Sequence, residues 1–96
     1  MITDLTINYS RGRFHGRARA GTGQCRRGRT VTIKRQRRGP DQTLGTKITR
    51  GRRGKYELSF PNAHGRFYAT VAKKTYFDAQ GNEYDCTADR SPTIAR

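Results

Sequence analysis

Apolar and polar side chains alternate along most of this chain, in short rows that are separated by turn signals. The stretch TVTI, residues 30–33, sets Val31 and Ile33 on one face and two threonines on the other, and YELSF, residues 56–60, repeats the pattern. A period of two is typical of a strand with one buried face. Glycine-containing turns such as SRGR, GTGQ, RRGK and DAQGN lie between the rows, which predicts short strands at even spacing. Arg35 is the exception, because it falls on the inward row, where the strand must leave the core or bulge.

Seven such rows can be traced, and each has one apolar and one polar face. An antiparallel sandwich buries one face of each sheet and leaves the other face in water. Residues 64–77, HGRFYATVAKKTYF, also fit a helix face, but their aromatic and β-branched content favours a strand or a long hairpin arm. The final SPTIAR is expected to be an edge strand or the exit toward a next module. We therefore expect an all-β fold over residues 1–96, a single antiparallel β-sandwich of about seven strands, transthyretin-like or immunoglobulin-like.

The net charge of the chain limits the classes of partner that it is expected to bind. Lysine and arginine together number 21 against seven acidic residues, so the formal net charge is +14, and only 31% of the residues are hydrophobic. Composition alone would permit disorder, so the fold prediction depends on the alternating pattern. A field of this sign attracts polyanions: nucleic acid, anionic membrane or cell-wall polymers, and acidic protein surfaces.

Two cysteines, Cys25 and Cys86, lie far apart and belong to no CxxC pair or histidine-rich cluster. Their placement argues against zinc and favours one long-range disulfide in an oxidising compartment, with a pair of buried free thiols as the alternative. No run of residues reaches the apolar length of a membrane span, and the start MITDLTINYS lacks the regions of a secretory leader. The chain is therefore expected to be either an excised mature domain or a protein made without a leader.

The sequence offers little for catalysis. His15 and His64 are the two histidines, each beside a glycine, and no GxSxG, HExxH or paired-carboxylate spacing accompanies them. We expect surface histidines, no enzymatic activity and no cofactor.

Four of the seven acidic residues fall within DAQGNEYDCTAD, residues 78–89. This run does not fit the twelve-position calcium loop, so we expect no metal site. Glu83 and Asp85 fall on the outward row, where pairing with arginines of a neighbouring strand is expected.

Arginines gather in the turns, where several loop ends are expected to form one anion-binding basic rim. Its predicted members are Arg26, Arg27, Arg29, Arg37, Arg38, Arg50, Arg52 and Arg53. A nucleic-acid binder would add exposed aromatic side chains for base stacking. The inward rows take most of the aromatic residues into the core, namely Tyr9, Phe14, Tyr56, Phe60, Phe67 and Tyr84. Tyr68 and Tyr76 are left as weak stacking candidates, and no RNP, KH or helix-turn-helix signature is present, so any nucleic-acid binding is expected to be non-specific.

The order of strands also suggests a family. The strands TVTI and TKIT, the turn RRGK, the aromatic-led strand YELSF and the segment HGRFYATV resemble carboxypeptidase regulatory-like and collagen-adhesin B-type modules, which are transthyretin-like sandwiches. The whole chain further resembles basic β-sandwich modules of actinobacterial secreted proteins, through LTINYSRGRFHGRA, a cysteine before the first central strand, GRFYATV, and a closing cysteine followed by SPT. The resemblance implies a non-catalytic extracellular module in which Cys25 and Cys86 are bridged.

Together these observations predict a non-enzymatic structural or adhesive module on a cell or particle surface. Its basic surface is expected to contact an anionic surface polymer or an acidic protein surface. One alternative is a decoration or accessory protein of a phage virion from a high-GC host, and another is a non-specific nucleic-acid-binding protein. A spacer without any ligand is also compatible with the sequence, since fold alone does not carry function.

Overall fold

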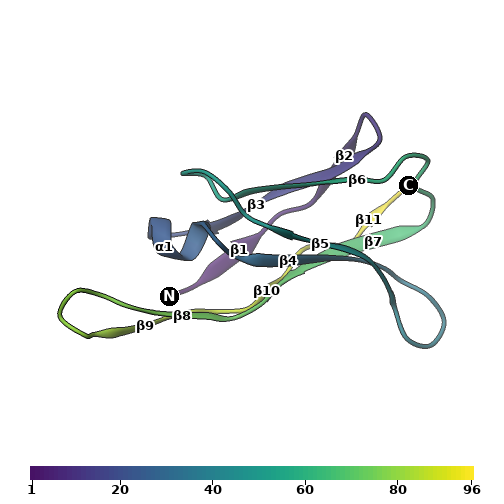
Figure 1. Cartoon of the computed structure of the whole chain (residues 1–96). Helices are drawn as coiled ribbons and strands as arrows, with labels where there is room; N and C mark the ends of the chain where they lie inside the picture. Colours follow the sequence, from purple (N-terminus) through teal and green to yellow (C-terminus); the bar gives the residue numbers. More distant parts are fainter.

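The alternating rows form strands throughout the computed structural model, which describes residues 1–96 (Figure 1). The strands are β1 Thr3–Leu5, β2 Asn8–Ser10, β3 Arg13–Ala20, β4 Thr30–Arg35, β5 Gln42–Ile48, β6 Lys55–Ser59, β7 Arg66–Val71, β8 Lys74–Phe77, β9 Glu83–Cys86, β10 Asp89–Arg90 and β11 Ile94–Ala95. The helix α1, Gly23–Arg26, is a single turn. No helix in the structure could cross a bilayer.

Two antiparallel sheets pack against each other and confirm the predicted all-β sandwich. In the first sheet β3 pairs with β1 and β2 on one side and with β6 on the other. In the second sheet β7 lies between β4 and the short strands β10 and β11, and β5 follows β4 at the edge. The core between the sheets consists of Leu5, Ile7, Phe14, Ala18, Val31, Ile33, Tyr56, Ala63, Phe67, Ala69 and Val71.

Two of the sandwich strands are interrupted, which explains why the structure has more strands than the sequence predicts. β1 and β2 follow the same register along β3, and β10 and β11 both pair with β7. Counted as continuous, these segments leave seven sandwich strands and one separate hairpin, formed by β8 and β9. The strand interpretation of residues 64–77 is thus confirmed, as is the edge position of the C-terminal segment.

The bulge expected in β4 at Arg35 is instead found in the partner strand β5. Ile33 pairs with Gly45 and Lys34 with Thr43, so Leu44 is the extra residue. β4 itself stays in unbroken register with β7 through Arg35, which is paired with Phe67. The Arg35 guanidinium lies 6.0 Å from the centre of the Phe67 ring, so a half-buried charged residue occupies a position of inward parity in a regular strand.

The hairpin of β8 and β9, with its connecting loop, stands apart from both sheets and projects from one end of the sandwich (Figure 1). We call residues 74–86 the arm. Its existence corrects the prediction that Tyr84 belongs to the core, because this side chain is 39% exposed and its ring stacks on Tyr76 at 5.2 Å between centroids. It also corrects the predicted pairing of acidic residues with arginines. Asp85 instead accepts a hydrogen bond from Thr75 at 2.7 Å and lies 3.9 Å from the Lys73 ammonium.

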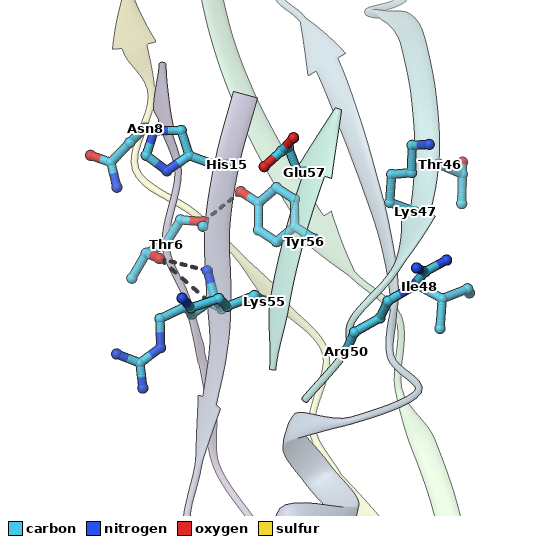
Figure 2. A pocket seen from close by; sticks show the side chains of 12 residues that line it. Thr6, Asn8, His15, Thr46, Lys47, Ile48, Arg50, Lys55, Tyr56 and Glu57 are labelled. Carbon is cyan, nitrogen blue, oxygen red and sulfur yellow. Dashed lines mark hydrogen bonds between the residues drawn. The ribbon is translucent and has the colours of Figure 1, made fainter. Parts of the chain in front are cut away.

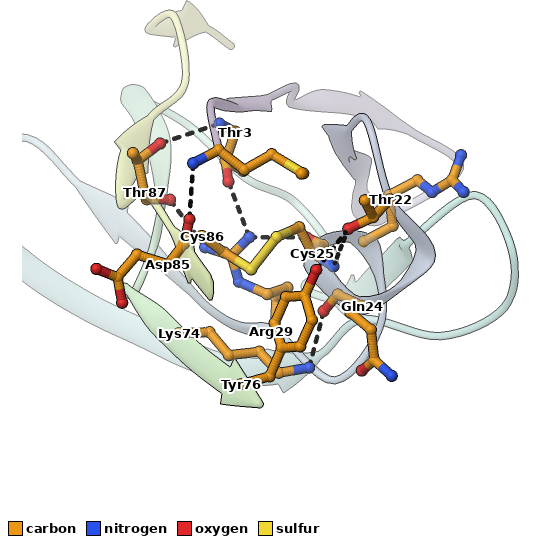
Figure 3. Close-up of a disulfide and its surroundings, with 12 residues drawn as sticks. Thr3, Thr22, Gln24, Cys25, Arg29, Lys74, Tyr76, Asp85, Cys86 and Thr87 are labelled. Carbon is orange, nitrogen blue, oxygen red and sulfur yellow. Dashed lines mark hydrogen bonds between the residues drawn. A yellow bond between two sulfur atoms is a disulfide. The ribbon is translucent and has the colours of Figure 1, made fainter. Parts of the chain in front are cut away.

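The disulfide predicted from the sequence is present. It joins Cys25 of α1 to Cys86 at the base of the arm (Figure 3). Both cysteines are fully buried. α1 forms because the Thr22 side chain caps its first turn and accepts from the backbone N–H of Cys25. The Lys74 ammonium donates to two carbonyls of this segment, Gln24 at 2.8 Å and Arg27 at 3.1 Å. The base of the arm is thus tied to α1 by a covalent bond and by charge-assisted hydrogen bonds.

Candidate functional site

The arginines predicted to form one basic rim occupy two ends of the β4–β5 hairpin. Arg26 and Arg27 precede β4, and Arg50, Arg52 and Arg53 follow β5, so antiparallel pairing brings these five to the same end. Arg37 and Arg38 lie in the connecting loop at the other end of the hairpin. The structure therefore divides the predicted rim into two separate clusters.

Near the first cluster, Thr49 links the two sides of that end. Its carbonyl accepts from the Gly28 N–H at 3.0 Å, and its hydroxyl donates to the Arg26 carbonyl at 2.6 Å. Thr49 is itself buried. Hydrogen bonds of Thr49 therefore connect the segment that contains Arg26 and Arg27 to the end of β5, directly before Arg50.

Arg29 is not part of any surface cluster, which corrects its place in the predicted rim. Its residue is 1% exposed, and its guanidinium donates to four oxygens from separate segments (Figure 3). These acceptors are the Thr3 hydroxyl at 2.9 Å and the carbonyls of Cys25 at 2.7 Å, Ala72 at 2.9 Å and Thr87 at 2.9 Å. Burial lowers the pKa of the Arg29 guanidinium. Its parity with the inward residues Val31 and Ile33 is the sequence signal that indicates this position.

A groove of about 710 Å³ opens between β5 and β6, next to the first arginine cluster (Figure 2). These two strands are joined by an antiparallel bridge between Arg50 and Lys55, after which each enters a different sheet. The space opened by their divergence is lined by Thr6, Asn8, His15, Gly16, Arg17, Thr46, Lys47, Ile48, Arg50, Lys55, Tyr56 and Glu57. We call it the basic groove.

Three cationic residues stand in a row across the basic groove. Arg17 of β3 is the register partner of Lys55 on β6, and Lys55 is in turn opposite Arg50. Directly opposed residues of antiparallel strands place their side chains on the same face, and like charges in such pairs are destabilising. Lys47 of β5 adds a fourth cation to the lining. The fold thus lines one groove with four cationic residues, three of which occupy directly opposed strand positions.

No acidic side chain neutralises this row. The ion pairs of the structure are Arg13 with Glu57 at 2.7 Å, Arg19 with Asp4 at 3.8 Å, and Lys73 with Asp85 at 3.9 Å. Glu57 lines the basic groove, yet its carboxylate is already bound by Arg13. The four cations of the groove are therefore available to an external anion.

The remaining lining combines polar and apolar groups. The Nε of Arg17 donates to the Arg53 carbonyl at 3.2 Å, which orients the guanidinium. His15 hydrogen bonds through Nε2 to the Ser10 hydroxyl at 3.1 Å. Ile48 is 51% exposed, because the register pairs it with Thr30 on the outer face of the sheet, while its neighbour Lys47 is opposite the buried Val31. The groove therefore offers one apolar side chain beside its cations.

Three cations of the groove, Arg17, Lys47 and Lys55, were not part of the predicted rim. Arg50 and Lys55 flank the turn RGRRGK, so a hairpin pairing read from the sequence would have placed them opposite each other. The addition of Arg17 depends on the pairing of β3 with β6, two strands separated by 34 residues in the chain. This long-range pairing has no local signal.

Comparisons with protein-family models, with curated proteins and with solved structures gave no match for this chain. The two packed antiparallel sheets agree with the β-sandwich that the sequence resemblance implies. The interpretation of the basic groove therefore rests on its own residues.

Proposed function

We propose that this protein is a non-enzymatic structural or adhesive module whose basic groove binds an anionic partner. The observation that carries the proposal is the row of Arg17, Lys55 and Arg50, in which Lys55 is opposite both arginines and none of the three forms an ion pair. An anion placed over this row would relieve the repulsion between the cations and gain charge-assisted hydrogen bonds. Relief of the repulsion between the opposed cations would thus contribute to the free energy of binding.

The groups in the basic groove suit carboxylate, sulfate or phosphate. Arginine binds such anions with two parallel N–H donors, and lysine adds a compact charge on a flexible stem. Because four cations line one groove, the partner would present several negative groups, as an acidic surface polymer or an acidic protein surface does. The buried disulfide supports a setting outside the reducing cytosol, either on a cell surface as the sequence resemblance implies or in a phage virion.

Non-specific nucleic-acid binding receives less support from the aromatic residues. The Tyr68 ring is covered by the Arg90 guanidinium, 3.8 Å from its centre, and the Tyr76 and Tyr84 rings stack on each other. Bases would have to displace these contacts before stacking on the rings. The net charge of +14 would still attract DNA at low salt.

A matched pair of variants tests the groove. Arg17→Gln with Lys55→Gln removes two charges from the basic groove, whereas Arg37→Gln with Arg38→Gln removes two from the exposed loop at the other end of the hairpin. Binding to heparin, to DNA and to purified cell wall would be measured as a function of salt. We expect the groove variant to bind its anionic ligand about tenfold more weakly at physiological salt, and the loop variant to bind nearly as the wild type does.

Equal losses in the two variants, for all three ligands, would contradict the proposal and indicate attraction by net charge alone. Unfolding of the groove variant would not explain a loss of binding. Removing like charges from opposed strand positions is expected to leave its stability unchanged or slightly raised.

A further inference from the structure

The charge of the chain is divided between the arm and the body. Residues 75–85, TYFDAQGNEYD, contain Asp78, Glu83 and Asp85 and no lysine or arginine, so this segment carries a charge of −3. Since the whole chain carries +14, the other 85 residues carry +17. The arm is thus an acidic projection on a strongly basic protein.

The arm also exposes apolar surface. Phe77 is 66% exposed and Tyr84 is 39% exposed, on a two-stranded hairpin that neither sheet covers. An isolated two-stranded hairpin is marginally stable in water, and exposed aromatic residues in such a place are typical of contact surfaces. At about 3.3 Å per residue, β8 alone extends roughly 13 Å. The arm is therefore long enough to enter a groove on a neighbouring molecule.

The arm is fixed in its outward direction. The disulfide from Cys86 to Cys25, the hydrogen bonds from Lys74 to α1 and the hydroxyl pair of Thr22 and Tyr76 at 3.5 Å hold its base (Figure 3). Beyond these contacts it projects past the end of the sandwich (Figure 1). In the structure the arm thus points away from the body that carries it, and its exposed side chains face outward.

The arm and the basic groove are complementary in both charge and apolar character. The groove offers four cations that form no ion pair, since Glu57 of the lining is bound by Arg13, and one exposed apolar side chain, Ile48. The arm offers three acidic residues and the exposed Phe77. We propose that the arm of one copy of this protein binds in the basic groove of a second copy, an inference that rests on the proposed function of the groove as an anion-binding site.

Such a contact joins two different surfaces of the same chain. Contacts of this heterologous type form rings when the rotation closes and open filaments when it does not. Each copy has one arm and one groove, so assembly would continue from both ends of a dimer. A ring or a one-dimensional filament on a cell or particle surface is the kind of structure that this contact alone would build.

Charge reversal on the arm and in the groove tests the contact. Glu83→Lys changes an exposed side chain of β9 that forms no ion pair or hydrogen bond in the free protein, and Lys55→Glu changes the centre of the groove. Association of the full-length protein would be followed by sedimentation velocity over a concentration series at low and at physiological salt. We expect the wild type to associate, and each single variant to associate at least about tenfold more weakly.

Mixing the two variants provides the decisive measurement. The lysine introduced on one molecule can meet the glutamate introduced on the other, and the remaining wild-type arm can meet the remaining wild-type groove, so association should return in the mixture. Asp4→Lys makes the same change in charge on β1 of the body and should leave association unchanged. Phe77→Ser should weaken association without any change in charge.

The outcomes separate this inference from the proposed function. A wild type that stays monomeric up to its solubility limit would overturn the inference, and so would undiminished association of Glu83→Lys and Phe77→Ser. In either case, heparin binding by the groove would still support the proposed function. Loss of heparin binding is expected for Lys55→Glu and not for the two arm variants.

Discussion

The hydroxyl of Tyr56 donates a hydrogen bond to the carbonyl oxygen of Thr6 at 2.5 Å, at the point where β1 ends and β2 has not yet begun. The Thr6 carbonyl thus accepts from a side chain, and the Arg17 N–H donates to the Thr6 hydroxyl at 2.9 Å. Gly16 makes the arrangement feasible, since a Cβ there would collide with both the Thr6 carbonyl and the Tyr56 hydroxyl. The interruption of the strand is therefore a specific structure built by these four residues, beside the basic groove.

Gly16→Ala should destabilise the protein for this reason. The added methyl group would displace the Thr6 carbonyl from the Tyr56 hydroxyl, and overpacking of this kind costs about 1–3 kcal/mol of unfolding free energy. Urea denaturation would measure the loss. Gly21→Ala is the matched control, because the nearest atom to its Cβ is the Met1 sulfur at 3.8 Å. A loss of equal size at both glycines would contradict the steric explanation.

Arg29→Met should lower the free energy of unfolding by about 3 kcal/mol or more. The methionine would fill part of the space, but the Thr3 hydroxyl and the three carbonyls now bound by the guanidinium would lose their donors inside the protein. Thermal and urea denaturation would measure the change. Arg52→Met, at an exposed turn position, is expected to change stability by less than about 0.5 kcal/mol. If the two substitutions had similar effects, Arg29 would not hold the segments together.

Removal of the disulfide should cost roughly 4 kcal/mol, since it closes a loop with a sequence separation of 61 residues. The double variant Cys25→Ala, Cys86→Ala would be compared with the wild type by urea denaturation, with and without reductant. Reductant should bring the wild type close to the variant and leave the variant unaffected. A wild type that resists full reduction without loss of stability would show that the sandwich and α1 suffice alone.

The bond between Tyr68 and Asp41 predicts a pH window of stability. The hydrogen bond from the Tyr68 hydroxyl lowers the pKa of Asp41, and the same bond raises the pKa of Tyr68. The stabilisation from Asp41 is present above its unfolded pKa of about 4 and is lost as the pH falls through the lower folded value. That from Tyr68 is present below about pH 10 and is lost as the pH rises through its higher folded value.

Tyr68→Phe removes this bond without removing the ring. The difference in stability between wild type and variant should be constant between about pH 5 and pH 9 and should shrink on both sides. NMR titration of the Asp41 carboxyl should show a higher pKa in the variant than in the wild type. An Asp41 pKa that is identical in the two proteins would contradict the assignment.

The alternation of side chains was sufficient to predict the sheets of this protein, because burial of one strand face is a local property of the sequence. Val31 and Ile33 are fully buried as predicted, whereas the bulge expected in β4 at Arg35 lies in β5, at Leu44. Tyr84 shows the limit of the method. Its row alternates as well as any other, yet alternation does not indicate whether a hairpin packs on the core or projects from it.

The basic groove was less accessible to prediction than the fold. Arginine-rich turns identified Arg50, but the row with Lys55 and Arg17 is created by pairing between strands that are distant in sequence. Arg29 was assigned to the surface because of its charge, although its parity places it inward. The net charge therefore predicted that the partner is negatively charged. The position of the basic groove followed only from the strand register.

The disulfide also changes what a protease can do to this chain. Fifteen of the 21 lysines and arginines lie between Cys25 and Cys86, many of them in exposed turns that a trypsin-like enzyme would cut first. A single nick anywhere in that span leaves the two fragments covalently joined, with the sheet pairings between them still in place. We therefore expect the two halves of the nicked chain to stay together until the disulfide is reduced, which gel electrophoresis with and without reductant would show.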